Sequence, residues 1–127
     1  MVDKVKLQEN KLSNNVWNRT VTGTRYSWDI PTLIQYAKEK KYKTFDLPLN
    51  GLDISWNPFD YSNVHDFINH VKRVNDVDLK YPVLIDNFGT VCDGWHRIVK
   101  AILKGDKYIK AIRIEEMPAA SHTEIVN

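Results

Sequence analysis

The chain has 127 residues, of which 43% are hydrophobic and 27% are charged, a composition typical of one ordinary globular domain. Its 18 basic and 16 acidic side chains leave a net charge of +2, so no whole-protein field requires nucleic acid as a partner. The single cysteine, Cys92, excludes an internal disulfide and favours a reducing compartment. The sequence has neither an apolar run of membrane-spanning length nor a signal peptide, so we expect a cytoplasmic protein with no membrane partner.

The N-terminal third is expected to carry a hairpin and a helix. Residues 1–15 are polar and predict a flexible arm. Aromatic segments flank Thr22-Gly23-Thr24, the pattern of a hairpin between residues 16 and 28. Asp29-Ile30-Pro31 predicts a helix start, and this helix would end in the lysine-rich run 38–43. Its inward positions are Leu33, Ile34 and Ala37.

Basic and aromatic residues are interleaved in the predicted hairpin. Arg19 and Arg25 lie among Trp17, Tyr26 and Trp28, a mixture that can stack nucleobases. Such aromatics more often cover the edge of a core, and the sequence leaves both interpretations open.

The middle of the chain predicts an edge strand, a loop and a helix. Residues 44–49 suit an edge strand because Pro48 cannot donate to a ladder. Alternation resumes at residues 52–55, and residues 56–62 form a turn-rich loop with three aromatics. A helix begins at Asn63. Its predicted core-facing residues are Val64, Phe67, Ile68, Val71 and Val74. His65 and His70 do not share a helix face, which makes them a poor metal pair.

Residues 81–105 organise the rest of the chain. Val83-Leu84-Ile85 predicts a strand buried on both faces, residues 86–89 a turn, and residues 90–92 a returning strand. A helix follows, with Gly105 at its C-terminal end. Its apolar stripe is Trp95, Ile98, Val99, Ile102 and Leu103. Residues 108–114 predict a final strand, and the last residues a loose tail.

The start of that helix has the chemistry of an anion site. Asp93 is a good N-cap, and backbone N–H groups in the first turn lack partners within the helix. Gly94 has no side chain, so a ligand could approach the backbone, while His96 and Arg97 add donors and positive charge. A phosphate would bind well there. The alternative is structural: Asp93 only caps, Arg97 pairs with a surface carboxylate and Trp95 belongs to the core.

Asp93-Gly94-Trp95-His96-Arg97, between a short strand and an amphipathic helix, resembles the corresponding motif of the ParB N-terminal/sulfiredoxin-like superfamily. The resemblance covers roughly residues 45–114 and is strongest to small ParB-like bacteriophage proteins. It implies an α+β fold with a small mixed sheet packed against helices over residues 45–118. Residues 16–44 would be an N-terminal extension packed on this core, residues 1–15 an arm and residues 119–127 a tail. The compartment would be the cytoplasm of a bacterial host cell.

The resemblance also implies site residues. In the superfamily this corner binds nucleotide phosphates, which carries over to Gly94, His96 and Arg97. Trp95 stands where sulfiredoxins have their catalytic cysteine, so their reaction is not expected. His96 replaces the first arginine of the partitioning proteins, and their following DNA-binding domain is not expected here.

The free-serine kinases of the superfamily have a similar motif, which Asp93, His96 and Arg97 match. Their further carboxylate comes from a loop after the first strand region, where Asp53 and Asp60 are the local candidates for nucleotide or phosphate binding.

Two functional hypotheses follow, and the sequence leaves open whether the protein is an enzyme. The first is a nucleotide-dependent phosphotransferase or hydrolase that uses ATP, ADP or another nucleotide with Mg²⁺. Asp93 would be a catalytic base or metal ligand and His96 a second catalytic residue. The second is a non-catalytic phage module that binds DNA or a host protein through its aromatic loops. No dense carboxylate cluster favours a nuclease, and the oligomeric state stays open, a dimer included.

Overall fold

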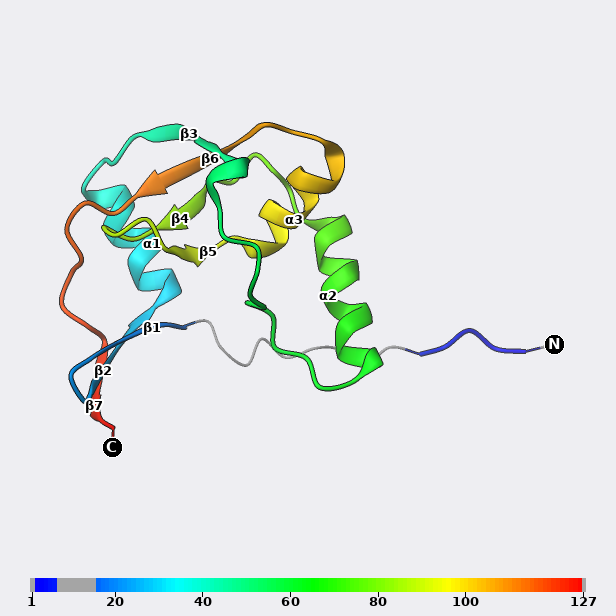
Figure 1. The fold of residues 1–127 in the computed structure, drawn as a ribbon, viewed down its shortest axis with the longest axis horizontal. Coiled ribbons are helices and arrows are strands. Elements are labelled where there is room, and N and C mark those ends of the chain that lie inside the picture. The colour runs from blue at the N-terminus through cyan, green and yellow to red at the C-terminus, as the bar shows by residue number, and fades with distance from the viewer. Residues whose placement is uncertain (1, 7–15, 127) are drawn as a thin grey trace.

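The computed structural model describes residues 2–6 and 16–126 and has an α+β fold (Figure 1). In this described part, three α-helices and a short 3₁₀ helix accompany two small sheets. Most of the arm predicted over residues 1–15 lies outside the described residues. None of the helices in residues 2–6 and 16–126 is long and apolar enough to cross a membrane.

The larger sheet has four strands in the order β3-β6-β4-β5. They are β3 (Thr44–Pro48), β6 (Tyr108–Arg113), β4 (Val83–Ile85) and β5 (Val91–Asp93). β6 runs antiparallel to β3 and parallel to β4, and β5 returns antiparallel to β4. β3 therefore lies at an edge, as its proline predicts.

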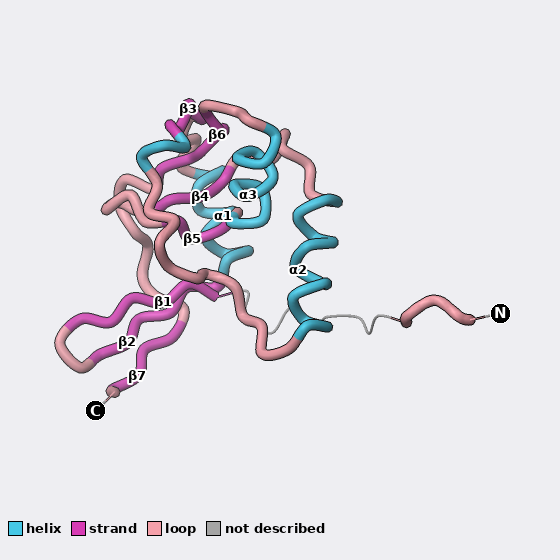
Figure 2. Tube along the Cα trace, turned by 45° about the vertical axis from the view of Figure 1, so that its right-hand side comes forward, coloured by secondary structure: helices cyan, strands magenta, loops and turns pink. Residues whose placement is uncertain are grey.

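Helices cover the two faces of this sheet (Figure 2). α1 (Ile30–Glu39) packs on one face and α3 (Trp95–Lys104) on the other. The central strand β4 contributes alternate residues to both layers, which confirms the prediction that it is buried on both faces. Val83 and Ile85 pack with Ile98 and Ala101. Leu84 packs in the second cluster, with Leu33 and Ala37.

The smaller sheet joins the two ends of the chain in the order β1-β2-β7. The predicted hairpin is confirmed as β1 (Val16–Val21) and β2 (Thr24–Asp29). The prediction of a loose tail is wrong, because β7 (His122–Ile125) pairs antiparallel with β2. The backbone groups of this short polar strand pair with a hairpin about a hundred residues away in sequence, which no local pattern reveals.

The hairpin turn contains a strained residue. Thr22 and Gly23 both have positive φ, 45° and 79°, as a two-residue type I′ turn requires. A β-branched residue rarely adopts this conformation, whereas asparagine does so readily. We expect Thr22→Asn to raise the free energy of unfolding by about 0.5–1 kcal/mol, measured by urea denaturation. The same change at Thr20, within β1, should not stabilise the protein, and a gain there equal to that at Thr22 would contradict the explanation.

A buried ion pair joins the hairpin to the larger sheet. Arg19 Nη2 lies 2.6 Å from Asp86 Oδ2, and Asp86 is 1% exposed. The Arg19 guanidinium lies over the Trp17 and Trp28 rings at 5.1 and 5.7 Å. Trp17 Nε1 also donates to the Val91 carbonyl at 3.2 Å. Trp28 is buried and Trp17 is half-buried against the same core cluster, so these two rings serve packing, contrary to the base-stacking interpretation.

The segment between β3 and α2 (Val64–Asp76) is irregular after the 3₁₀ helix η1 (Leu49–Gly51). The prediction of strand-like alternation at residues 52–55 is wrong, because Asp53 Oδ1 accepts hydrogen bonds from Ser55 N and Oγ and so forms a turn. α2 begins as predicted: the Asn63 side chain accepts from the Asp66 N–H at 2.8 Å.

The predicted core-facing stripe of α2 is wrong, because four of its five residues face solvent. Val64, Phe67, Ile68 and Val71 are 74%, 45%, 40% and 46% exposed, and only Val74 is buried. α2 stands beside the sheet and packs on α3 (Figure 1). Its buried and half-buried residues are mainly polar: His65, Asp66, Asn69, His70, Arg73, Val74.

The other two predicted stripes extend further than the core does. On α1, Leu33 and Ala37 are buried but Ile34 is 36% exposed. On α3, Ile98 is fully buried, whereas Leu103 at the last turn is 77% exposed. On both helices the outermost apolar positions of the predicted stripe therefore reach solvent.

Candidate anion site at the start of α3

α3 begins without a side-chain cap. Gly94 is the N-cap residue, and no side-chain cap hydrogen bond to this helix is present among residues 2–6 and 16–126. The first hydrogen bond of the helix runs from Ile98 N–H to Gly94 O. The N–H groups of Trp95, His96 and Arg97 precede it and have no intrahelical acceptor. This is the arrangement in which a helix start binds an anion.

The prediction that Asp93 caps this helix is wrong. Asp93 is the last residue of β5, where it pairs with Leu84. Its carboxylate accepts instead from Arg97 Nη2 at 3.1 Å. The first turn of α3 itself contains no acidic residue.

Gly94 is required for packing rather than for ligand access. Its φ of 116° belongs to the region that favours glycine. A Cβ atom there would lie 2.5 Å from Val83 Cγ1 and 2.9 Å from Arg97 Nη2. The space expected for a ligand on that side is therefore filled by the protein.

Arg97 has unused capacity for hydrogen bonding. Its Nη2 donates to Asp93 and, at 3.4 Å, to the Pro82 carbonyl. Its Nε is buried and has no hydrogen-bond partner in the part of the chain that the structure describes. Buried donors are nearly always paired, so this nitrogen is suited to an acceptor that arrives from outside the chain.

A second arginine, on α2, faces the same corner. Partial burial lowers the pKa of Arg73, while the negative charge of Asp93 raises it. The sequence interpretation assigned Arg73 only to the polar face of its helix. The available signal was the spacing of three between His70 and Arg73, which places both on one side of α2. Arg73 is therefore a cation of the corner that sequence reasoning missed.

His96 and His70 form a stacked pair between α3 and α2. His96 Nε2 lies 2.9 Å from His70 Nδ1, with ring centroids 5.1 Å apart. His70 Nε2 lies 2.7 Å from the Asp60 carbonyl, which can only accept. In a neutral pair, His70 must therefore donate from Nε2 and accept at Nδ1 from His96. This leaves the Nδ1 lone pair of His96 as an acceptor or base.

His96 is neutral at physiological pH, contrary to the positive charge expected of it. Burial lowers its pKa to about 4, with further lowering by the charges of Arg73, His70 and Arg97. The positive charge of the corner therefore comes from Arg73 and Arg97, and His96 supplies hydrogen-bonding groups.

This pKa predicts a pH-dependent stability. Unfolded His96 takes up a proton below about 6.5 and folded His96 only near 4, so the unfolded state binds more protons in that window. Between pH 7 and pH 4 the wild type should lose about 1–2 kcal/mol more unfolding free energy than His96→Gln, after allowance for solvent screening. Urea denaturation across this range measures the difference. Parallel pH profiles for the two proteins would contradict the shift.

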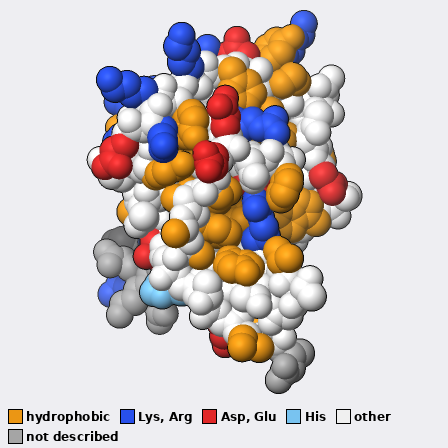
Figure 3. Space-filling view, turned by 90° about the vertical axis from the view of Figure 1, so that its left-hand side faces the viewer, with side chains coloured by type: hydrophobic (Ala, Val, Ile, Leu, Met, Phe, Trp, Pro, Cys, Tyr) orange, Lys and Arg blue, Asp and Glu red, His pale blue; other side chains and the backbone are white. Residues whose placement is uncertain are grey.

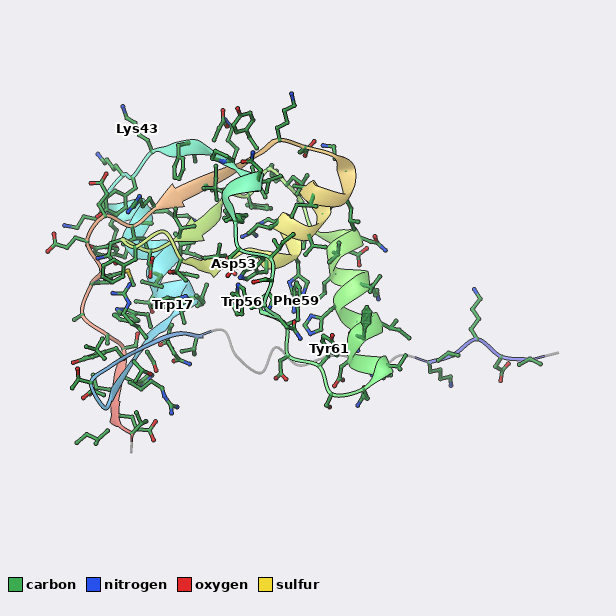
Figure 4. All side chains as sticks on the ribbon, viewed as in Figure 1. Trp17, Lys43, Asp53, Trp56, Phe59 and Tyr61 are labelled. Carbon is green, nitrogen blue, oxygen red and sulfur yellow. The ribbon has the colours of Figure 1, made fainter. Side chains whose placement is uncertain are left out.

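The loop of residues 52–62 passes across the corner (Figure 4). The Phe59 ring packs at a tilt against His70 and His96, with ring centroids 5.2 and 5.0 Å apart, and Trp56 meets Trp95 edge-on at 5.6 Å. Asp60 joins the corner through its backbone carbonyl.

The other predicted carboxylate is already engaged nearby. Asp53 is bound to Ser55, and those two hydrogen bonds lower its pKa. Asp53 lies on the same loop as Trp56 and Phe59 (Figure 4), but its carboxylate makes no hydrogen bond to Asp93 or Arg97 among the described residues.

Acidic and histidine side chains do not build a metal site here. Among residues 2–6 and 16–126, no group of three or more His, Cys, Asp or Glu side chains could hold a metal ion. Asp93 contributes one carboxylate, already paired with Arg97. A Mg²⁺ ion would fit only if it arrived with the phosphates of a nucleotide, which is how such ions are commonly held.

No protein-family model, no curated protein and no solved structure matches this chain. The function is therefore inferred from the geometry of the corner.

Proposed function

We propose that this protein binds the phosphate groups of a nucleotide at the start of α3, as a member of the ParB/sulfiredoxin-like superfamily. One observation supports this most strongly. The uncapped first turn of α3 lies beside a buried Arg97 Nε that has no hydrogen-bond partner among the described residues. Helix N–H groups and an arginine fork together suit a phosphate better than either does alone.

Different residues around this turn would bind the phosphate, supply a base and exclude water. Arg97 and Arg73 would supply positive charge, because His96 is neutral. The Nδ1 lone pair of His96 could accept a proton from a nucleophile or from a phosphate-bound water. Phe59, which covers the histidine pair, would exclude water from that side.

We also propose that the protein catalyses a reaction at a phosphoryl group of the bound nucleotide. Asp93 would serve as base or as a ligand to nucleotide-bound Mg²⁺, with His96 as second catalytic residue. For either role Asp93 must exchange its Arg97 partner, 3.1 Å away, for the incoming substrate. The phosphate itself would then become the new partner of Arg97.

A thermal-shift screen tests the binding proposal. ATP, ADP, CTP, GTP and NAD would be added with and without Mg²⁺, because a ligand of the native state raises the apparent melting temperature. We expect a shift with at least one nucleotide, and at least a tenfold loss of affinity in Arg73→Gln. Lys72→Gln, which removes the neighbouring exposed cation of α2, is the matched control and should bind like wild type. No shift with any nucleotide would contradict the proposal.

A non-catalytic role in binding a host protein is the second candidate, and the exposed face of α2 favours it. Val64, Phe67, Ile68 and Val71 form an apolar stripe open to solvent, and such stripes commonly mark contact surfaces. The variant Asp93→Asn distinguishes the candidates. Loss of nucleotide turnover with retained binding supports the enzyme, whereas a wild type that neither binds nor turns over nucleotide is the result that the second candidate predicts.

A further inference from the structure

A hollow of about 470 Å³ lies where β3 begins and β6 ends. Its lining combines three cations, two aromatic rings and one carboxylate: Lys41, Tyr42, Lys43, Phe45, Arg113, Glu115. Figure 3 looks onto this end of the molecule and shows basic and hydrophobic side chains side by side over its upper part. The Lys43 side chain extends into solvent there (Figure 4). None of these residues belongs to the corner at α3.

The first cation occupies a backbone position that suits glycine. Lys41 follows the C-cap residue of α1 and has a φ of +58°. Glycine or asparagine usually occupies this place, because a longer side chain is strained there. A favourable interaction with the helix dipole explains a cation near the end of α1. It does not explain a lysine at the strained position itself, which suggests a functional constraint.

The other two cations are neighbours at the same end of the sheet. Thr44 pairs with Ile112 at the last step of the register, and Lys43 and Arg113 come next to that pair on the two chains and both line the hollow. Like charges placed near each other across an antiparallel pair are destabilising. Arg113 uses one donor on the Asn87 carbonyl, at 2.6 Å, and its remaining N–H groups are available for an anion.

An exposed ring lies beside these cations. Phe45 pairs with Ala111 and alternates with Lys43 along the chain, so both side chains belong to the same face of the sheet. The ring is 37% exposed. Three locally unfavourable features thus meet at one hollow: a strained lysine, a like-charge pair and an open aromatic ring. Such concentrations are expected at functional sites.

We infer that this hollow binds a nucleotide unit, with its phosphate on the cations and its base on the aromatic ring. Lys41, Lys43 and Arg113 would hold the phosphate, and Phe45 would stack on the base. The Glu115 carboxylate would accept from an exocyclic amino group, as carboxylates do with cytosine and other amino-bearing bases. The volume of the hollow suits one nucleotide. The ligand is therefore a free nucleotide or one unit of a single-stranded nucleic acid.

Fluorescence anisotropy with labelled oligoadenylate, oligothymidylate and adenosine monophosphate tests this inference. Oligoadenylate should bind more tightly than oligothymidylate, because thymine has no exocyclic amine. With three phosphate contacts, log Kd should rise with log salt at a slope of about 2. Stronger binding of the strand identifies nucleic acid as the source of the ligand, and equal or stronger binding of the monophosphate identifies a free nucleotide. Both results support the site.

Lys41→Gly is the decisive variant, because it should raise the melting temperature while weakening binding. The salt slope should fall by about 0.7, the share of one lost cation, and Phe45→Ala should weaken binding at least tenfold. Lys104→Ala, which removes an exposed lysine from the end of α3, and Arg73→Gln should leave the affinity within twofold. Absence of binding by wild type at about 50 mM salt, or an unchanged Kd in Lys41→Gly and Phe45→Ala, would overturn the inference. An unchanged Kd in Lys41→Gly and Phe45→Ala leaves the site at α3 in place, because that site depends on Arg73 and Arg97 instead.

Discussion

Replacing Gly94 with alanine is expected to lower the free energy of unfolding by about 2–6 kcal/mol. Two costs of about 1–3 kcal/mol each combine in this variant. The backbone at φ 116° is strained for alanine, and the new Cβ would lie 2.5 Å from Val83 Cγ1 and 2.8 Å from Val83 Cβ. Val83 is fully buried in the central strand β4, so it has no free space to move into. Urea denaturation measures the loss.

Gly105→Ala is the matched control for this prediction. Gly105 also has a positive φ, 86°, but a Cβ there would meet no atom within 4 Å. Gly105→Ala should therefore lower the free energy of unfolding only by the cost of the strained backbone, about 1 kcal/mol. If the two substitutions prove equally destabilising, the close approach of Gly94 to Val83 does not contribute.

Removing the Asp86 carboxylate is expected to have the next largest effect, a loss of about 3–5 kcal/mol for Asp86→Ala. Oδ2 of this buried carboxylate lies 2.6 Å from Arg19 Nη2, and Oδ1 accepts from the N–H groups of Phe88 and Thr90 at 2.9 and 2.8 Å. The substitution leaves three donors without their acceptor. Asp86→Asn retains the Oδ1 acceptor of the turn and should lose less. Urea denaturation again gives the measurement.

An exposed ion pair of the same small sheet provides the comparison. Arg25 and Glu124 lie 3.6 Å apart, and their side chains are 42% and 67% exposed. Glu124→Ala should change the free energy of unfolding by less than about 1 kcal/mol. A similar, small effect for Asp86→Ala would mean that the pair with Arg19 does not hold the hairpin to the larger sheet.

Local patterns predicted most elements of the fold. The turn at Thr22-Gly23, the cap at Asn63 and the C-cap at Gly105 each depend on a few neighbouring residues, and all three are present. The general α+β class follows from the same patterns.

Features that depend on distant residues could not be predicted in this way. Apolar periodicity identified the stripe of α2 but not the side on which the core lies, so Phe67 and Val71 were assigned to the wrong face. The pair between Arg19 and Asp86 joins residues 67 positions apart, and the sequence marked Asp86 only as a turn residue.

The strand-turn-helix corner that the sequence predicted is present at Gly94, and its role in binding phosphate stays a prediction. The sequence did not predict the residues that α2 contributes to the corner. His70 meets His96 and Arg73 faces Asp93 only because two helices cross in space. This packing also makes His96 neutral, which its place in the first turn of a helix does not reveal.

The most direct test of phosphate binding at α3 is an NMR titration that follows the backbone amide signals. Inorganic tripolyphosphate and ADP should both shift the amides of Trp95, His96 and Arg97 most strongly, because these N–H groups precede the first hydrogen bond of the helix. The positions of the shifted amides separate this site from the hollow beside Phe45, because binding in the hollow would shift the amides around Lys43 and Phe45 instead. Amides of α3 that remain unmoved at saturating concentrations of both ligands would contradict the proposed function.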